Sequence, residues 1–169
     1  MDVVLVDKND KVIGLREKFE AHKNPVPLHR AVSVVIFDPK GEKMLIHQRA
    51  SEKKTWPGYW TNATCTHPNP EESYKEAASR RLYEEMGFRT PLTEIFRFIY
   101  NARFDKTWGE HELDVVFVGK YKGSVKPNKD EVSDYKWIAV PELWEDVLEN
   151  PDKYTPWFKI ILSKLKLTA

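Results

Sequence analysis

The sequence predicts one mixed domain of the α+β or α/β class over residues 1–169. Two kinds of segment support this class: runs of β-branched residues bounded by turn residues, and segments that open with helix-capping residues. The sequence contains no repeat, low-complexity tract or linker-like stretch. A chain of this length buries roughly 70% of the surface that its unfolded form exposes, so it needs neither a metal nor a disulfide merely to fold.

Two hairpins and three further strands make up the predicted sheet. Residues 3–6 alternate between apolar and polar types, pass through a turn and return through 12–13. Residues 29–38 are rich in β-branched side chains, and a Pro-Lys-Gly turn leads back through 43–49, so this second hairpin belongs in the interior of the sheet. The further strands are expected at 95–100, 110–118 and around 135–138.

Three helices are predicted from their end signals. The clearest begins with Asn69 as N-cap, followed by a proline and two glutamates that suit the positive end of the helix dipole, and it ends at Gly87. A shorter helix follows Pro141. The last helix starts with Thr155 as its cap and a proline at its first position.

The composition excludes several classes of partner. Lysine and arginine number 27 against 26 aspartates and glutamates, so the long-range field does not attract nucleic acid or an anionic membrane. An anionic substrate therefore needs a local basic patch. The longest apolar run, 31–37, is far shorter than the ~20 residues of a membrane span. With a single cysteine and no leader signal, we expect a soluble cytoplasmic protein, as a monomer or weak homodimer.

The single cysteine, Cys65, lies in the stretch TNATCTHP, directly after the aromatic run WPGYW. A lone cysteine is ordinarily an inert, small core residue. Here its neighbours include a histidine that can bind metal and tryptophans that could wall off a dry pocket, which favours a reactive thiol. The local sequence leaves both interpretations open.

A carboxylate falls in the apolar stripe of the clearest helix. The 3.6-residue period places Glu85 on the same face as Ala78 and Leu82. Burial of a lone carboxylate is costly, so Glu85 must be paired, protonated or bound to a cation. A salt bridge to Arg81, four residues earlier, and metal binding are the two alternatives.

Histidines and glutamates form a second candidate cluster. Glu110 and Glu112 share one face of a predicted strand, so their like charges lie close together. If the face is exposed, solvent screens their repulsion; if it is covered, a divalent cation is the simplest explanation for the pair. His22 and His29 flank a proline-containing segment that is held extended. With His67 they could supply three imidazoles and two carboxylates, a set that suits six-coordinate Mn²⁺, Mg²⁺ or Zn²⁺.

Basic side chains gather near these candidates. Arg49, Lys53 and Lys54 precede the Trp-Pro-Gly turn, and Arg80 and Arg81 lie on the clearest helix. Such a cluster is usually a solvated face, but beside metal ligands it could clamp a diphosphate.

These motifs resemble those of the type 1 isopentenyl-diphosphate Δ-isomerases, a branch of the Nudix fold, over nearly the whole length. The most specific stretches are RASEKKTWPGYWTNATCTHP at 49–68, the pair His22 and His29, GEHE at 109–112 and TPW at 155–157. The resemblance implies a Nudix-like fold with a central mixed sheet flanked by helices. It also implies conversion of isopentenyl diphosphate to dimethylallyl diphosphate by protonation and deprotonation, in isoprenoid biosynthesis.

The resemblance also implies a role for each matching residue. Cys65 and Glu112 correspond to catalytic residues that face each other across the substrate, and Tyr100 and Trp157 to catalytic aromatic residues. Two divalent ions are implied. One, Mn²⁺ or Zn²⁺, would be held by His22, His29, His67, Glu110 and Glu112. Glu85 would help Mg²⁺ to bind the diphosphate. Contacts to the diphosphate would come from Arg49, Lys53, Arg81 and Lys18.

The chain departs from the wider Nudix signature at two places. A glycine of that signature is Thr66 here, and its Arg-Glu pair is Arg80-Arg81. Hydrolysis in that superfamily depends on several metal-bound carboxylates on this helix, so the loss of one argues against a pyrophosphohydrolase. The rival functions are a Nudix hydrolase of nucleoside or prenyl diphosphates and a non-catalytic binding module stabilised by metal.

Overall fold

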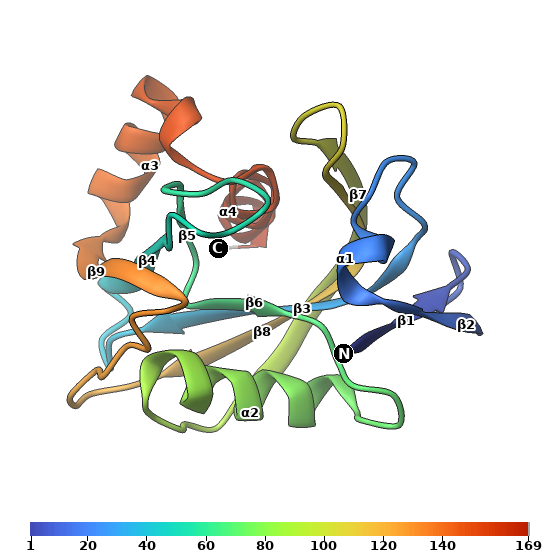
Figure 1. Cartoon of the computed structure of the whole chain (residues 1–169). Coiled ribbons are helices and arrows are strands. Elements are labelled where there is room, and N and C mark those ends of the chain that lie inside the picture. Colours follow the sequence, from blue (N-terminus) through green and yellow to red (C-terminus); the bar gives the residue numbers. More distant parts are fainter. Residues whose placement is uncertain (169) are drawn as a thin grey trace.

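The computed structural model describes residues 1–168, with side chains up to residue 166. Its described part contains one sheet that is organised around strand β3, His29–Phe37 (Figure 1). This strand pairs antiparallel with β1 (Asp2–Val6), β4 (Lys43–Arg49) and β6 (Thr64–Thr66). It pairs parallel with β8 (Gly109–Lys120), so the sheet is mixed, as predicted.

The remaining strands extend this sheet from its neighbours. β2 (Val12–Glu17) pairs with β1, and β7 (Thr93–Arg103) pairs with β8. β5 (Trp60–Thr61) and β9 (Val132–Ala139) pair with β4. Both predicted hairpins and all three further predicted strands are confirmed, although β7, β8 and β9 are longer than expected. The two-residue and three-residue strands β5 and β6 are additional.

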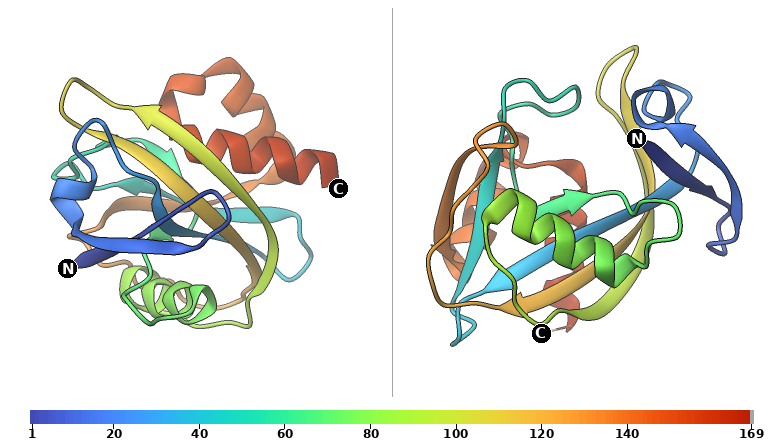
Figure 2. Two further views of the ribbon diagram at one scale, coloured as in Figure 1. Left: turned by 90° about the vertical axis from the view of Figure 1, so that its right-hand side faces the viewer. Right: turned by 60° about the horizontal axis from the view of Figure 1, so that its bottom comes forward.

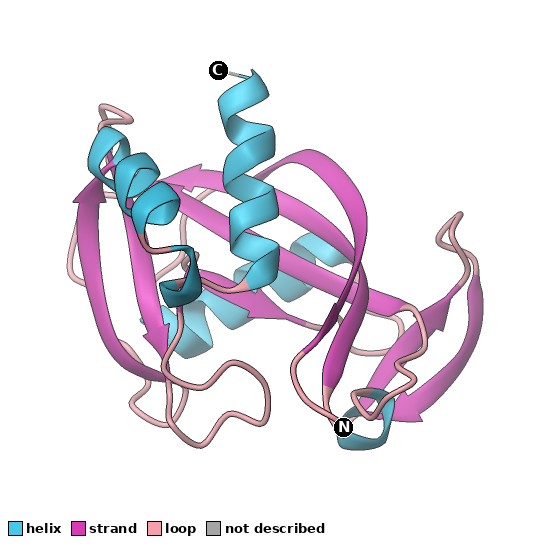
Figure 3. Ribbon diagram, turned by 90° about the horizontal axis from the view of Figure 1, so that it is seen from above, coloured by secondary structure: helices cyan, strands magenta, loops and turns pink. Residues whose placement is uncertain are grey.

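Helices cover both faces of the sheet. Figure 2 brings α2 (Tyr74–Met86) in front of the strands, and Figure 3 shows α4 (Pro156–Thr168) lying across the opposite face. α3 (Val140–Glu149) lies on the same side as α4 (Figure 1). Each face of the sheet carries a hydrophobic core, and alternate residues of β3 point into one core or the other. Val34 packs beneath α2, whereas Val35 joins the aromatic cluster beneath α4.

The start of α2 corrects one prediction. The helix begins at Tyr74 rather than after Asn69, because Glu71 has a positive φ of 68° and interrupts the helical path. Ser73 is the N-cap, and it exchanges hydrogen bonds with Glu76 in a capping box. The Ser-Tyr-Lys-Glu sequence carries this signal. Gly87 ends the helix with a φ of 78°, as predicted.

Two further features position the site. A four-residue helix, α1 (Lys18–Ala21), ends immediately before His22 and was not predicted. α4 begins at the predicted proline, directly after Thr155. In the described part of the chain, every helix is too short or too polar to traverse a lipid bilayer.

Candidate active site

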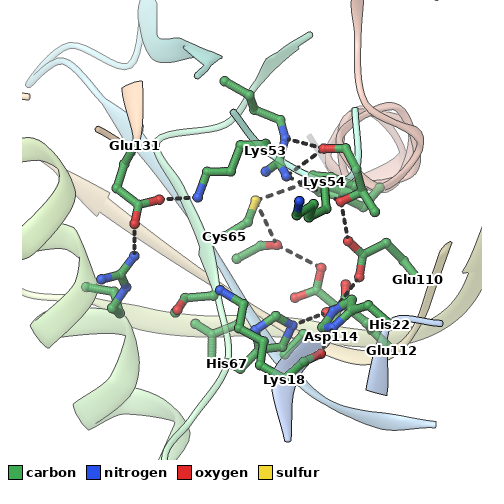
Figure 4. A pocket seen from close by; sticks show the side chains of 18 of the residues that line it. Lys18, His22, Lys53, Lys54, Cys65, His67, Glu110, Glu112, Asp114 and Glu131 are labelled. Atoms are coloured by element: carbon green, nitrogen blue, oxygen red, sulfur yellow. Dashed lines mark hydrogen bonds and ion pairs between the residues drawn. The ribbon is translucent and has the colours of Figure 1, made fainter. Parts of the chain in front are cut away.

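A cavity of about 280 Å³ opens between the N-terminal segment, α2 and α4, and most of the predicted site residues border it (Figure 4). The predicted residues in its lining are Lys18, His22, Arg49, Lys53, Cys65, His67, Arg81, Glu110, Glu112 and Trp157. His29, Glu85 and Tyr100 lie directly behind this lining. Each contacts a side chain that borders the cavity: His29 and Tyr100 contact Glu112, and Glu85 contacts Arg81.

Three imidazoles and two carboxylates converge at one side of the cavity. One ligand atom from each of His22, His29, His67, Glu110 and Glu112 lies within 4.8 Å of all the others. Strand register brings about part of this convergence, because His29 of β3 is directly opposite Glu112 of β8. Opposite ligands of a six-coordinate ion with bonds of about 2.2 Å are about 4.4 Å apart, so the spacing suits such an ion.

The hydrogen bonds behind the imidazoles aim their free nitrogens inward. Nδ1 of His22 donates to the Lys18 carbonyl at 2.6 Å, and Nδ1 of His29 donates to the Pro27 carbonyl at 2.9 Å. Each Nε2 therefore presents its lone pair to the cluster. Within the described residues, His29 Nε2 and Glu110 Oε2 are buried without a hydrogen-bond partner. Orphaned buried ligand atoms of this kind fit a bound divalent metal ion.

The electrostatics of the five ligand residues also favour a bound divalent cation. Burial disfavours a charged His22, but the Glu110 carboxylate, 3.0 Å away, raises the pKa of His22 to about 9. Burial lowers the pKa of His67 to about 4. Three adjacent imidazoles cannot all be protonated, whereas one divalent cation neutralises both carboxylates and leaves the imidazoles neutral.

Glu110 is oriented through the loop before β5. Thr55 donates its hydroxyl to Glu110 Oε1 at 2.9 Å. Arg49 in turn donates from Nη2 to the Thr55 carbonyl at 2.9 Å and from Nε to the Trp56 carbonyl at 3.2 Å. The Arg49 guanidinium also lies 5.2 Å from the centre of the Trp157 ring. Arg49 therefore braces the loop and the indole, in addition to bordering the cavity.

Four side chains contact the Cys65 thiol, and one of them is Thr61, whose hydroxyl lies 3.9 Å from the sulfur. It donates to Oδ1 of Asn62 at 3.0 Å and accepts from the indole Nε1 of Trp157 at 2.9 Å. Ser33 Oγ lies 3.7 Å from the sulfur. Burial raises the pKa of Cys65 to about 12, so the thiol carries its proton at neutral pH. Asn62 was not predicted to take part, although it lies within the TNATCTHP stretch.

Glu112 lies between the histidines and Tyr100. Its Oε2 is 2.8 Å from His67 Nε2 and 3.3 Å from His29 Nε2, and its Oε1 accepts a short hydrogen bond from the Tyr100 hydroxyl. Burial opposes ionisation, but the adjacent His29 and His67 hold the pKa of Glu112 well below its usual value. Burial and the nearby carboxylate raise the pKa of Tyr100, which stays a proton donor.

Asp114 also borders the cavity but was not among the predicted site residues. It accepts a hydrogen bond from Ser33 at 2.7 Å, and burial raises its pKa well above the usual range. The signal was present in the sequence, because the two-residue period of β8 continues from Glu110 and Glu112 to this residue.

Glu85 makes the ion pair that was one of its two predicted alternatives. Its Oε1 accepts from Arg81 at 2.7 Å, and its Oε2 accepts from the Thr64 hydroxyl at 2.6 Å. Burial raises its pKa despite these partners. One contact on each oxygen leaves a lone pair available, so the carboxylate can still contribute to a cation site.

The remaining basic residues divide into two groups. Arg80 turns toward Glu72, which accepts from it at 2.7 and 2.8 Å, and it does not border the cavity. Lys54 does border the cavity, together with the four predicted diphosphate contacts.

The fold and this site define a Nudix protein: the sequence model of the NUDIX domain matches residues 27–158, and the chain belongs to that family. Within it, the chain belongs with the isopentenyl-diphosphate Delta-isomerases. The protein of that name from Pectobacterium atrosepticum is 42% identical over 164 residues, covering 97% of this chain and 90% of that protein. Isopentenyl-diphosphate Delta-isomerase 2 of Photorhabdus laumondii is 44% identical over 163 residues, with coverages of 96% and 91%.

Solved structures resemble this chain in fold. A Deinococcus radiodurans protein superposes with a TM-score of 0.72 at 17% identity, covering 89% of this chain and 90% of its own. A MutT protein from Methanosarcina mazei gives a TM-score of 0.67 at 22% identity, with coverages of 84% and 95%.

Proposed function

We infer that this protein is an isopentenyl-diphosphate Δ-isomerase, which moves the double bond of isopentenyl diphosphate to give dimethylallyl diphosphate in isoprenoid biosynthesis. One observation carries the inference. Cys65 and Glu112, which arrive on different strands, border the same cavity beside the five-residue ligand group. Relatives about 40% identical over nearly the full length are named for this activity.

The reaction requires two proton transfers and no net change in composition. One group protonates the terminal alkene carbon, a tertiary carbocation forms, and a second group removes a proton from the adjacent methylene carbon on the opposite side. We assign these transfers to Cys65 and to Glu112 with its hydrogen-bonded Tyr100. The protonated thiol can give up a proton, and the ionised Glu112 carboxylate, which Tyr100 hydrogen-bonds, can take one up.

The carbocation needs a dry, electron-rich surrounding. Trp157 is 3% exposed and borders the cavity, and its ring packs edge-on against Trp56 with centroids 5.6 Å apart. A desolvated cation-π contact of about 2 kcal/mol corresponds to roughly 30-fold in rate. We propose that Trp157 stabilises the developing charge and that the apolar cluster around it excludes water.

Two metal ions are part of the proposal. We propose that His22, His29, His67, Glu110 and Glu112 hold Mn²⁺ or Zn²⁺, and that Glu85 helps to hold Mg²⁺ with the substrate diphosphate. Bound there, the ions would neutralise the diphosphate oxygens and tune the proton affinity of Glu112. Mg²⁺ typically takes one or two carboxylates plus phosphate oxygens, so a single glutamate suffices.

The diphosphate is assigned to the basic side of the cavity. Lys18, Lys53 and Arg81 border the cavity, and Arg49 borders it with its guanidinium 5.2 Å from the centre of the Trp157 ring. The binding energy of the charged group would hold the small hydrocarbon beside Cys65. We further propose that residues 1–169 act as one catalytic domain, as a monomer or weak homodimer in the cytoplasm.

The rival hydrolase is disfavoured by the altered signature helix. Arg81 stands where the Nudix signature has a glutamate, so the helix offers one metal-binding carboxylate fewer, and the Arg81 guanidinium engages Glu84 at 2.7 Å.

The deciding experiment offers isopentenyl diphosphate and Mg²⁺ to the purified protein and measures the acid-labile allylic product. We expect turnover by the wild type and near-complete loss in Cys65→Ser, with unchanged circular dichroism and melting temperature. Phosphate release would indicate a hydrolase. Metal-dependent melting without turnover would indicate a binding module.

A further inference from the structure

Glu131 places a carboxylate among the basic residues of the cavity. It lies just before β9 and borders the cavity, and its Oε2 accepts a short ion-paired hydrogen bond from Lys53 Nζ. Its Oε1 lies 3.5 Å from Nη2 of Arg81. Figure 4 shows Glu131 and Lys53 on the opposite side of the cavity from His22 and Glu110. Glu131 is thus separate from the ligand group.

The backbone fixes the position from which this carboxylate reaches the cations. The Glu131 amide donates to the Asn128 carbonyl at 3.0 Å, and its carbonyl accepts from the Ala50 amide at 3.2 Å. Only 26% of each side chain is exposed for Glu131 and Lys53, and 20% for Arg81. Charges that are half removed from water interact more strongly than those of an open surface.

Lys18 is a third cation near Lys53 and Arg81, the two that Glu131 contacts. Burial and the charge of Lys53 both lower the pKa of Lys18, and Arg81 lowers it further, whereas Glu131 raises it. Glu131 therefore compensates a group of like charges that would otherwise repel one another. A single carboxylate cannot satisfy all of them.

We propose that Glu131 is an internal counter-ion of the anion site, which the diphosphate of the substrate must displace from Lys53 and Arg81. The inference rests on the proposed function, since it concerns the same diphosphate. A diphosphate brings more charge and more oxygens than one carboxylate and therefore displaces it. A small anion of low charge gains little over Glu131. Glu131 thus sets both the affinity of the site and its preference for diphosphate over monophosphate.

Glu52 provides a matched control. It borders the same cavity, and in the described part of the chain its carboxylate is bonded to the neighbouring Ser51 rather than to a cation. Glu52→Gln therefore removes one negative charge from the lining of the same cavity without releasing Lys53 or Arg81 from an ion pair.

The test is calorimetric titration of wild type, Glu131→Gln and Glu52→Gln with inorganic diphosphate, with and without Mg²⁺, and with inorganic phosphate. We expect Glu131→Gln to bind diphosphate about tenfold more tightly, equivalent to about 1.4 kcal/mol. Its affinity for phosphate should rise by a larger factor, so that selectivity falls. Glu52→Gln should stay within about twofold of wild type, as expected for a screened charge that is not paired with a cation.

Steady-state kinetics give a second readout. Glu131→Gln should lower KM for isopentenyl diphosphate more than it changes kcat, and Glu131→Asp, which keeps the charge, should restore most of the wild-type KM. Circular dichroism of each variant checks folding, and Glu131→Ala, which also removes the charge, keeps the test informative if the glutamine variant unfolds.

Three outcomes would overturn the inference. Unchanged or weaker diphosphate binding by folded Glu131→Gln would refute the role of Glu131 as a counter-ion but not the proposed function. Weakening only in the presence of Mg²⁺ would make Glu131 a metal ligand instead. Failure of both wild type and Glu131→Gln to bind diphosphate would refute the assigned anion site, and the inference with it.

Discussion

The indole Nε1 of Trp157 donates a hydrogen bond to the sulfur of Cys65 at 2.9 Å. This contact joins the start of α4 to β6 and holds the indole edge toward the thiol. Trp157 therefore has two separable properties, an N–H group that contacts the sulfur and a π surface.

Substitutions at Trp157 can separate these properties. Trp157→Phe keeps an aromatic face but loses the N–H donor, and Trp157→Leu loses both. We expect kcat to fall about 10- to 100-fold in the phenylalanine variant, because the N–H would stabilise the thiolate that forms when Cys65 gives up its proton, and a hydrogen bond to a charged group contributes roughly 1.5–3 kcal/mol. The leucine variant should lose roughly a further 30-fold. Diphosphate affinity, measured by calorimetry, should be unchanged; a loss of affinity alone would contradict both roles.

Glu85→Gln should raise the Mg²⁺ concentration that half-saturates turnover, because the amide retains a partner for Thr64 but loses the charge. Glu84→Gln is the matched control. Glu84 also contacts Arg81 at 2.7 Å, but its side chain is 43% exposed and lies outside the buried site. Magnesium titrations of activity compare the two variants. An unchanged curve for Glu85→Gln, or the same shift for Glu84→Gln, would exclude the assignment.

Removal of the divalent ion should destabilise the fold as well as abolish turnover. A ligand present at 100 times its Kd contributes about 2.7 kcal/mol, and about 2–4 °C of Tm per kcal/mol gives a loss of roughly 5–10 °C. Dialysis against chelator followed by thermal melting measures this. The melting temperature should recover when Mn²⁺ or Zn²⁺ is restored.

His111 provides a control for the metal prediction. It lies between Glu110 and Glu112 but turns to the other face of β8, where Nδ1 donates to the Val26 carbonyl at 3.0 Å. His111→Ala should bind metal as the wild type does, whereas His29→Ala should not. Equal metal content in both variants would argue against the predicted ligand set.

His47 should make stability depend on pH. Burial and the charge of Arg49 lower the pKa of His47 to about 3, and its Nδ1 donates to the Ala63 carbonyl at 3.1 Å. The unfolded chain takes up a proton below about pH 6.5, whereas the native imidazole does not. Its contribution to stability is therefore complete above pH 6.5 and is lost as the pH falls toward 3, by at most about 1.4 kcal/mol per pH unit.

The variant His47→Asn tests this dependence, because its amide can replace the donor but does not titrate. Urea unfolding at pH 7 and pH 4.5 should give a smaller difference in unfolding free energy for the variant than for the wild type. Equal differences would remove His47 as the cause.

Local signals in the sequence accounted for most of the sheet and for the ligand group. The alternation in β8 placed Glu110 and Glu112 together, and the helical period placed Glu85 in the apolar stripe. Tertiary pairing decided what local patterns could not. Ser33 reaches Cys65 because β6 pairs with β3, which sets the two residues opposite each other.

One other feature required information from beyond the local pattern. Glu131 meets Lys53 and Arg81 through a loop whose path no periodicity predicts. The start of α2, in contrast, has a local signal, because the capping box of Ser73 and Glu76 begins the helix rather than Asn69.

Strand β8 constrains how the chain can change in length. Its acids face the cavity, while the intervening Leu113, Val115 and Phe117 pack into the core beneath α2. Deletion of one residue within the strand would exchange these two sets, sending carboxylates into the core and aliphatic groups into the cavity. Insertions and deletions that preserve activity should therefore be confined to connecting loops such as 104–108.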